Sequence, residues 1–423
     1  MLSRQRASAA VAVSVTALAL IAPGVGASHP FSRFEPLKSS TTCTAAGGNP
    51  NDPLTLPPSF SQDVIASEPQ FPDFIDMNTV NETGPDAGRY LYRTHELPQG
   101  SAAVTVTDLS TITPEDQEEQ DTGETRVLAS RADWERFDGI RWTPFGTIIA
   151  AEEVNNPAVS PDPTVPQARA GLLYEIDPSS GAAAARPGVG ARAHEGIDFD
   201  GAGNLYGISE TDPGYLYKFV PDVKGDLSSG QLFALKITQS NGDRTGGARW
   251  VPLDRTQVQI DSDEAAAAAG ATGYARPEDI EIAGDGYMYV AITDEDRVLQ
   301  VSLPGGRNAT VSQYVKAGVN APRDFFKPDN LVLDVDRNLY ITEDPGGFFA
   351  TGKTQGDDIW VARPGSNLNR TRASRTVRFA SLTDCDAEPT GIYFAPGQPG
   401  TLYVNIQHRG GDTLDKALSV RKR

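Results

Sequence analysis

The feature that most constrains the fold is a short strand pattern that recurs along most of the chain. Each copy has a turn residue, usually glycine, followed by aromatic or β-branched side chains, which is typical of β-strands. The copies lie at 88–92, 146–149, 171–176, 203–208, 286–290, 338–341 and 400–404. Helical periodicity is scarce, and only a short helix is expected over 265–271. The chain is therefore expected to be an all-β protein.

Several of these strands are followed by a second strand at the distance of a hairpin. The pairs are 205–208 with 215–219, 287–292 with 297–301, and 339–342 with 358–361. Hairpins that repeat every few tens of residues are typical of a β-propeller. Their spacing is irregular, so the blades are expected to carry insertions. A β-sandwich, or two separate β domains, is the alternative.

The predicted propeller is a single domain over 71–415. An extended lead-in rich in Ser, Thr, Pro and Asn precedes it at 28–70, and a short basic tail follows at 416–423. Residues 1–27 have the order of a secretory signal peptide, with Arg4 and Arg6, an apolar run and small residues up to Ala27. An uncleaved membrane anchor is the alternative, although the apolar run is short for a bilayer span and no other span is expected.

Cleavage near Ala27 would place the protein outside the cytoplasm, secreted or in a periplasmic or extracellular space. The only two cysteines are Cys43 and Cys385. In an oxidising compartment they could form a disulfide that spans nearly the whole chain. Two free thiols are the alternative, since pairing does not follow from the sequence alone.

The chain is acidic, with 56 Asp and Glu residues against 37 Lys and Arg residues and a formal charge of −19. This balance argues against nucleic acid as a partner, because binding nucleic acid requires basic surface. No G-x-S-x-G nucleophile motif, P-loop or dinucleotide fingerprint is present. A Ser-His-Asp triad stays open as an alternative but has no local support in the sequence. The carboxylates offer a more specific pattern.

One group of carboxylates recurs just before or after the predicted strands. In a propeller such positions converge near the axis, where carboxylates repel one another unless cations lie between them. Oxygen ligands favour hard metals such as calcium or magnesium, and also suit iron. The alternative is that each acid is simply solvated. The candidate metal ligands are Asp138, Glu152, Glu153, Glu195, Glu278, Asp329 and Glu388.

The stretches that hold these acids resemble the PhoX-type alkaline phosphatases and their relatives. The similar stretches are 138–147 with the pair Glu152-Glu153, 194–195, 276–278, 328–331, 388–391 and 402–408. They occur in the order of that family. The most specific pieces are Thr-Pro-Phe-Gly-Thr followed by Glu-Glu, and Val-Asn-Ile-Gln-His.

The resemblance implies a six-bladed propeller with an axial iron–calcium cluster that hydrolyses phosphate monoesters, so the partner would be a small phosphate ester. The seven acids above would be metal ligands or their supports. Arg276 would hold the phosphoryl oxygens, because a planar guanidinium matches phosphate. The metals would bind the phosphate and supply the nucleophile.

One position departs from the family pattern. Members of the family carry an iron-ligating cysteine five residues before the first Thr of this motif, and Asp138 stands there. A thiolate is a soft ligand and a carboxylate a hard one. The alternatives are a site that holds calcium alone and one that holds iron with altered properties. A non-catalytic calcium-binding propeller and another metal-dependent propeller hydrolase, such as a lactonase, stay open as alternative functions.

Overall fold

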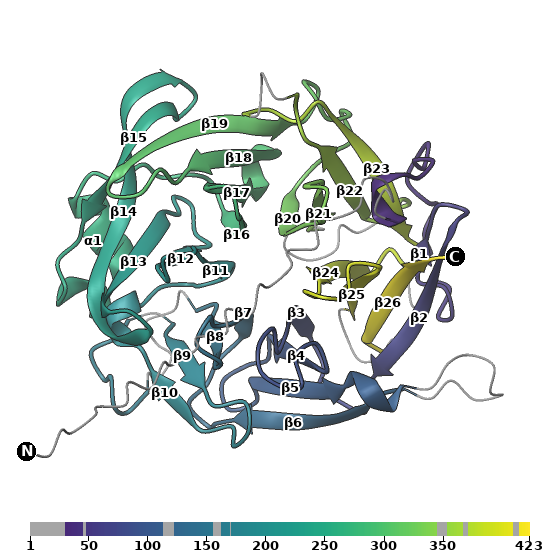
Figure 1. Ribbon diagram of the computed structural model, residues 1–423, viewed down its shortest axis with the longest axis horizontal. Helices are drawn as coiled ribbons and strands as arrows, with labels where there is room; N and C mark the ends of the chain where they lie inside the picture. Colours follow the sequence, from purple (N-terminus) through teal and green to yellow (C-terminus); the bar gives the residue numbers. More distant parts are fainter. Residues whose placement is uncertain are drawn as a thin grey trace, which may run out of the picture.

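Antiparallel sheets surround a central axis in the computed structural model (Figure 1). The structure describes residues 30–44, 48–112, 122–154, 162–169, 171–344, 353–366, 371–408 and 414–423. The predicted signal peptide at 1–27 lies outside these residues. The expected all-β propeller is confirmed. Among the described residues, no helix has the length and apolar character needed to span a bilayer.

Each sheet runs outward from a strand beside the axis. One contains β3 (Ile75–Val80), β4 (Tyr90–His95), β5 (Ala103–Asp108) and β6 (Glu124–Ser130). The next contains β7 (Phe137–Trp142), β8 (Ile148–Glu152), β9 (Leu173–Ile176) and β10 (Ala183–Ala185). A further sheet contains β20 (Pro328–Leu333), β21 (Leu339–Glu343), β22 (Asp358–Arg363), β23 (Arg375–Leu382) and β1 (Leu54–Thr55). Another contains β24 (Ala387–Phe394), β25 (Thr401–His408), β26 (Lys416–Lys422) and β2 (Phe60–Ser67).

The remaining strands form one nine-stranded sheet with an inner strand at each end. Its first part contains β11 (Ile197–Phe199), β12 (Leu205–Ile208), β13 (Leu216–Val223), β14 (Asp226–Gly242) and β15 (Thr245–Pro252). Its second part contains β16 (Pro277–Ala283), β17 (Tyr287–Ile292), β18 (Arg297–Ser302) and β19 (Asn308–Lys316). The parts join where β15 pairs with β19, for example at Ala248 and Ala309. The described strands therefore form five sheets rather than six separate ones.

Little of the described chain is helical. The helix α1 (Ser262–Ala268) begins at Asp261, whose side chain accepts hydrogen bonds from the amides of Asp263 and Glu264. It overlaps the short helix expected over 265–271 but begins and ends three residues earlier. The short 3-10 turns are η1 (Pro30–Ser32), η2 (Leu109–Thr111), η3 (Pro187–Val189), η4 (Gln257–Gln259) and η5 (Thr293–Glu295).

The three predicted hairpins are all present, as β12 with β13, β17 with β18, and β21 with β22. Successive side chains of a strand point to opposite faces of its sheet, so large side chains lie in the layers between neighbouring sheets. The fully buried Trp134, Trp250 and Trp360 each belong to such a layer. The aromatic and β-branched residues that predicted the strands therefore also form the core that holds the ring together.

Residues from both ends of the chain close the ring. The strand β2 pairs with β26, and β1 pairs with β23, so strands occur on both sides of the predicted limits at 71 and 415.

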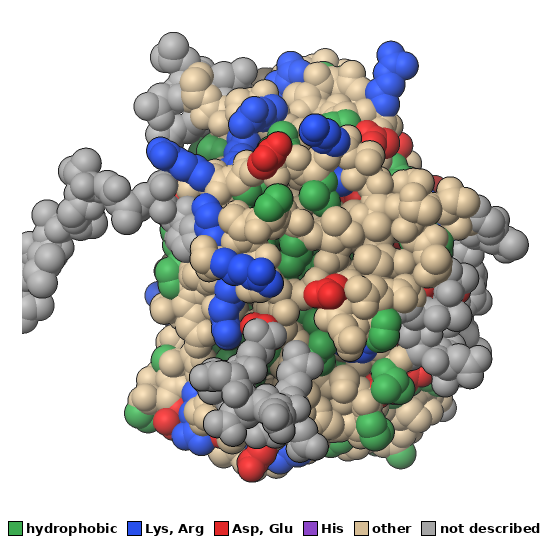
Figure 2. Space-filling view, turned by 90° about the vertical axis from the view of Figure 1, so that its right-hand side faces the viewer, with side chains coloured by type: hydrophobic (Ala, Val, Ile, Leu, Met, Phe, Trp, Pro, Cys, Tyr) green, Lys and Arg blue, Asp and Glu red, His purple; other side chains and the backbone are tan. Residues whose placement is uncertain are grey.

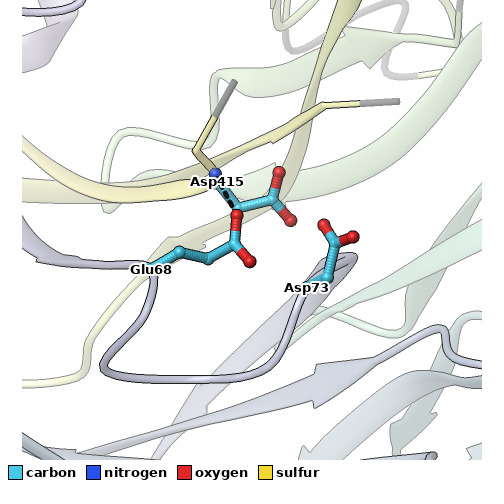
Figure 3. Close-up of side chains that lie close together, drawn as sticks. All are labelled: Glu68, Asp73 and Asp415. Carbon is cyan, nitrogen blue, oxygen red and sulfur yellow. Dashed lines mark hydrogen bonds between the residues drawn. The ribbon is translucent and has the colours of Figure 1, made fainter. Parts of the chain in front are cut away.

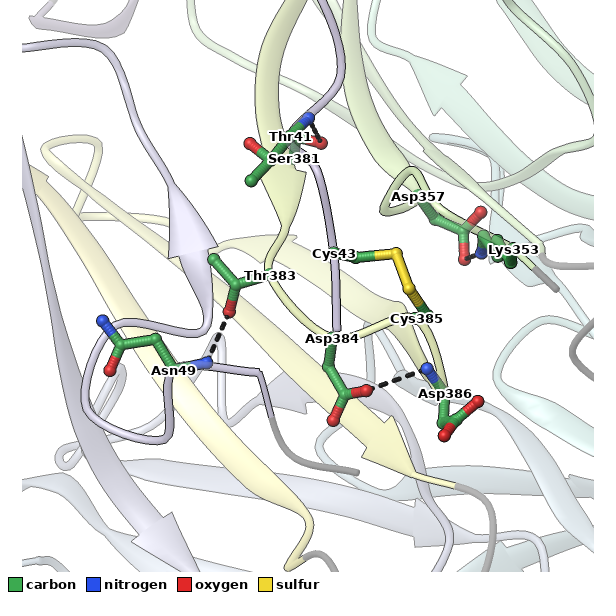
Figure 4. Close-up of a disulfide and its surroundings, with 10 residues drawn as sticks. All are labelled: Thr41, Cys43, Asn49, Lys353, Asp357, Ser381, Thr383, Asp384, Cys385 and Asp386. Atoms are coloured by element: carbon green, nitrogen blue, oxygen red, sulfur yellow. Dashed lines mark hydrogen bonds and ion pairs between the residues drawn. A yellow bond between two sulfur atoms is a disulfide. The ribbon is translucent and has the colours of Figure 1, made fainter. Parts of the chain in front are cut away.

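A disulfide joins Cys43 to Cys385, which resolves the alternative left open by the sequence (Figure 4). Beside it, the Asn49 amide donates to Thr383 Oγ1 at 3.0 Å. On this flank, basic side chains gather along one edge although the chain is acidic (Figure 2).

Candidate metal centre

Acidic side chains occupy equivalent positions on the strands that line the axis. Five inner strands carry an acid as their second residue: Asp76 in β3, Asp138 in β7, Glu278 in β16, Asp329 in β20 and Glu388 in β24. Glu195 lies two residues before the remaining inner strand, β11. The inner strands converge around the centre of the ring (Figure 1). Five of these six acids were predicted, and Asp76 was not.

A second group of acids follows the strands that pair with the inner ones. Glu96 follows β4, Glu153 follows β8, Asp344 follows β21, and Glu210 lies two residues beyond β12. The register explains why they reach the same end of the axis. Ile75 pairs with His95, Phe137 with Glu152, and Pro328 with Glu343, so each inner strand begins where its neighbour ends. We call the ten acids of these two groups the axial cluster.

The axial cluster is buried at its base and open at its edge. Asp138, Glu195, Glu278 and Asp329 are buried, whereas Glu153 is only half-buried. The ligand oxygens of Glu195, Glu210 and Glu278 all lie within 4.8 Å of one another. The arrangement therefore offers closely spaced oxygen ligands.

Burial and mutual repulsion raise the pKa values of carboxylates in the axial cluster. The pKa of Glu195 is raised well above its ordinary value, first by burial and then by Glu278 and Asp138. The pKa of Asp138 is raised well above its ordinary value by burial and then by Asp76. Two buried oxygens, Asp138 Oδ1 and Glu195 Oε2, have no hydrogen-bond partner among the residues that the structure describes. Such groups are costly unless a cation binds them, so the residues fit a metal centre.

Arg276 lies at the edge of the axial cluster and contacts three of its members. Its Nη2 is 2.7 Å from Oε1 of Glu278 and 2.7 Å from Oε1 of Glu210. Its Nη1 is 2.7 Å from Oδ2 of Asp344. The carboxylates oppose the effect of burial and raise the pKa of Arg276, so this guanidinium stays charged. Its side chain keeps 26% of its exposure, so solutes can reach it.

The backbone before several inner strands is left-handed. The residues concerned directly precede β3, β7, β16 and β20, and are Phe74 (φ 52°), Arg136 (φ 32°), Arg276 (φ 51°) and Lys327 (φ 40°). Non-glycine residues adopt this region at a cost, and such strain is concentrated at functional sites. The same turn thus precedes the acids Asp76, Asp138, Glu278 and Asp329.

Glu152 does not belong to the axial cluster. Its Oε1 accepts a hydrogen bond from the Glu135 amide at 3.1 Å, and its Oε2 accepts one from the Leu172 amide at 2.9 Å. Side chains alternate along a strand, so Glu152 and Glu153 point in opposite directions. Glu343 in β21 has the same role, since it accepts hydrogen bonds from the Phe326 and Asp358 amides. Glu152 thus stabilises the backbone of its own blade and is not directed at the axis.

Other acids on the inner strands also have structural partners. Asp198 pairs with Arg141 at 3.0 Å and accepts a hydrogen bond from the Ile282 amide on the next inner strand. Asp279 accepts one from the Leu331 amide at 2.7 Å. These carboxylates link neighbouring inner strands. They therefore need no cation, unlike Asp138 and Glu195.

Four members of the axial cluster were missed by the sequence analysis: Asp76, Glu96, Glu210 and Asp344. A repeated sequence pattern at the ends of strands could have identified some of them. Glu343-Asp344 repeats the pattern of Glu152-Glu153 at the end of a second strand, and His95-Glu96 ends its strand in the same way. Glu210 carries no such signal, because it lies two residues beyond its strand.

The donor set is made of carboxylate oxygens. No cysteine of the chain lies there, since Cys43 and Cys385 form the disulfide. His194 is buried and its Nε2 lies 2.9 Å from the Gly190 carbonyl oxygen. Hard cations with oxygen ligands, such as calcium, fit this set best.

Residues 139–311 match the protein family described as alkaline phosphatase PhoX. This region contains four of the axial acids, Glu153, Glu195, Glu210 and Glu278, and Arg276. The resemblance to the PhoX family is confirmed. A solved structure of Pseudomonas fluorescens PhoX, in complex with the transition-state analogue vanadate, has the same fold. Its TM-score is 0.67, with 18% identity over 91% of this chain and 97% of that one. The PhoX-like region therefore lies within a PhoX-like propeller.

Two further similarities are weaker. A putative gluconolactonase structure matches with a TM-score of 0.51 and 10% identity, over 90% of this chain and 98% of that one, and so shares the fold alone. A tRNA-specific 2-thiouridylase MnmA from Symbiobacterium thermophilum is 27% identical over 122 residues. That match covers 26% of this chain, and the chain spans 30% of the length of that relative.

Proposed function

We propose that this protein is a metal-dependent phosphatase that hydrolyses phosphate monoesters at the axial cluster. The observation that carries the proposal is the convergence of buried carboxylates beside Arg276 in a PhoX-like propeller. Both the family and the fold support metal-dependent phosphatase chemistry. The cluster has the composition that such chemistry requires, with hard ligands for cations and one guanidinium for an anion.

Calcium is the proposed metal, with iron as a second component. Asp138, Glu195, Glu278, Asp329 and Glu388 would hold the ions from the inner strands, with Glu153 at the open edge. Bound cations would supply positive charge for the phosphoryl oxygens and favour ionisation of water at the centre. The carboxylate of Asp138, at the position of the family cysteine, favours calcium over a softer metal.

The remaining residues would bind and orient the substrate. Arg276 presents a planar, permanently charged fork at the edge of the cluster, which suits the oxygens of a phosphate group. The base of the cluster is buried, so it excludes bulk water, and electrostatic interactions are stronger there than in solution.

We further propose that the protein acts outside the cytoplasm. The signal-like segment at 1–27 supports this location, and so does the disulfide between Cys43 and Cys385, because disulfides persist in oxidising compartments. Calcium is abundant in such compartments, which agrees with an all-carboxylate centre.

Hydrolysis of a chromogenic phosphate monoester at alkaline pH tests the function. We expect turnover by the metal-saturated protein, loss with a chelator, and recovery when metal is restored. The Arg255→Ala variant is a matched control, because Arg255 forms an exposed ion pair with Asp222. A protein saturated with calcium and iron that shows no hydrolysis would contradict the proposal, and chelator-sensitive melting without turnover would indicate a non-catalytic calcium-binding propeller.

A further inference from the structure

One asparagine next to the axial cluster connects three of the strands that line the axis. The inner strands β20, β24 and β3 belong to three different sheets, so no ladder of backbone hydrogen bonds joins them among the described residues. Side-chain contacts therefore help to set how the acids on these strands lie relative to one another. Asn330, the third residue of β20, makes such contacts.

The Asn330 side chain uses both ends of its amide. Its Nδ2 donates to Oδ1 of Asp329 at 2.8 Å, which fixes one oxygen of a proposed metal ligand. Its Oδ1 accepts the Gly391 amide at 2.6 Å and the hydroxyl of Thr390 at 2.8 Å, both on β24. Asn330 is 1% exposed, so bulk water does not compete for these hydrogen bonds. The side chain thus ties the Asp329 carboxylate to the strand that carries Glu388.

Thr390 extends the connection to a third inner strand. Its Oγ1 lies 2.5 Å from Oδ1 of Asp76 on β3, and Thr390 is as deeply buried as Asn330. The strands β24 and β3 approach closely here, because a Cβ at Gly391 would overlap the Asp76 carbonyl oxygen. The chain of side-chain contacts therefore runs from Asp329 through Asn330 and Thr390 to Asp76.

A separate acidic group fixes the backbone just before Asp76. Glu68, Asp73 and Asp415 lie close together where the two ends of the chain meet (Figure 3). Asp415 Oδ2 accepts the Ile75 amide at 3.0 Å, directly before Asp76 in the chain. This contact holds the start of β3 and leaves the orientation of the Asp76 carboxylate to its side-chain partners.

We propose that Asn330 is a positioning residue, which holds the carboxylates of Asp329 and Asp76 in one arrangement before the metal binds. The inference rests on the proposed metal-binding role of the axial cluster, but not on the reaction that follows. Residues that orient metal ligands contribute roughly 10–100-fold to metal affinity. The neutral amide suits this role, because it donates to a carboxylate and accepts from the next blade without adding charge to the cluster.

Calcium binding by chelator-treated protein, followed by isothermal titration calorimetry, tests the proposal. Asn330→Ala should raise the calcium concentration needed for half-saturation by about 10-fold or more. Asn338→Ala is the matched control, because buried Asn338 lies between β20 and β21 and its Nδ2 donates to Asp334 at 2.7 Å. Both substitutions remove an amide that donates to an aspartate, so a purely structural role would give both variants the same calcium affinity.

Two variants of Thr390 separate the hydrogen bond from the shape of the side chain. Thr390→Val removes the hydroxyl and keeps the branched shape, so its calcium affinity should fall. Thr390→Ser keeps the hydroxyl and should bind calcium nearly as well as the unmodified protein. Combining Thr390→Val with Asn330→Ala should weaken binding by less than the product of the two separate effects, since both act on one chain of hydrogen bonds.

Equal calcium affinities of Asn330→Ala and Asn338→Ala would overturn the proposal. So would equal affinities of Thr390→Val and Thr390→Ser, or absence of calcium binding by the unmodified protein. Circular dichroism without metal checks the fold of each variant, and the two Thr390 variants give the deciding comparison if Asn330→Ala does not fold. An unmodified protein that binds calcium but hydrolyses no phosphate monoester would contradict the proposed function, whereas the expected effect of Asn330→Ala on calcium binding would still support the positioning role.

Discussion

Glu152 and Glu153 are neighbours in the chain, and their carboxylates have opposite surroundings. Glu152 accepts the backbone amides of Glu135 and Leu172 within its blade. Glu153 faces the axis, where burial raises the pKa of its side chain and Glu210 and Glu96 raise it further. The two residues of the Glu-Glu motif therefore have different surroundings, with Glu152 bonded within its blade and Glu153 in the proposed metal centre.

Substitution of these two residues should have opposite effects. Glu152→Gln leaves one buried amide without an acceptor, so it should lower the free energy of unfolding by about 1–3 kcal/mol and leave the metal content unchanged. Glu153→Gln should reduce the metal content and phosphatase activity with little loss of stability in the metal-free protein. Denaturant unfolding and elemental analysis of both variants provide the test, and loss of metal from Glu152→Gln alone would reverse the assignment.

Arg276→Ala should lower kcat/KM for a phosphate monoester by about 100-fold or more, because it removes a charged donor from the edge of the cluster. Arg276→Lys keeps the charge but loses the planar fork, so it should recover only part of the activity. Steady-state kinetics at saturating metal measure both effects. Activity equal to that of the Arg255→Ala control would show that Arg276 has no role in the reaction.

Asp138→Cys should restore the thiolate that the family uses for iron. A soft ligand in place of a hard one should raise the ratio of bound iron to bound calcium. Elemental analysis and the absorption spectrum after purification with both metals measure this ratio. Asp138→Asn, which has no thiol, is the control, and an iron content no higher in Asp138→Cys than in Asp138→Asn would contradict the prediction.

The metal-free protein should become less stable as the pH rises. The axial carboxylates have pKa values raised well above the ordinary 3.8 and 4.5, as for Asp138 and Glu195. Between the ordinary and the raised values the folded state binds more protons than the unfolded state, so the free energy of unfolding falls with increasing pH. Calcium should reduce this dependence because it stabilises the ionised carboxylates. Thermal unfolding at several pH values between the ordinary and the raised pKa values, with calcium or with a chelator, measures this pH dependence. A metal-free protein whose stability rises with pH over that interval would contradict the prediction.

Much of the fold could be predicted from local patterns. The hairpins at 205–219, 287–301 and 339–361 follow from alternation of apolar side chains and from turn residues, which act over a few positions. The joining of β15 to β19 could not be predicted this way. It depends on the long strand β14 and on a pairing between Ala248 and Ala309, residues far apart in the chain.

For the candidate site, the sequence alone shows that carboxylates recur at the starts of the predicted strands, as at Asp138, Glu278 and Asp329. Which of these acids meet depends on the three-dimensional arrangement of the strands. It brings in Glu210 from beyond a strand and removes Glu152, because a side chain's direction depends on strand alternation and on the register between strands. Convergence at an axis is likewise a property of the closed ring, since no local pattern records the distance between Glu195 and Glu278.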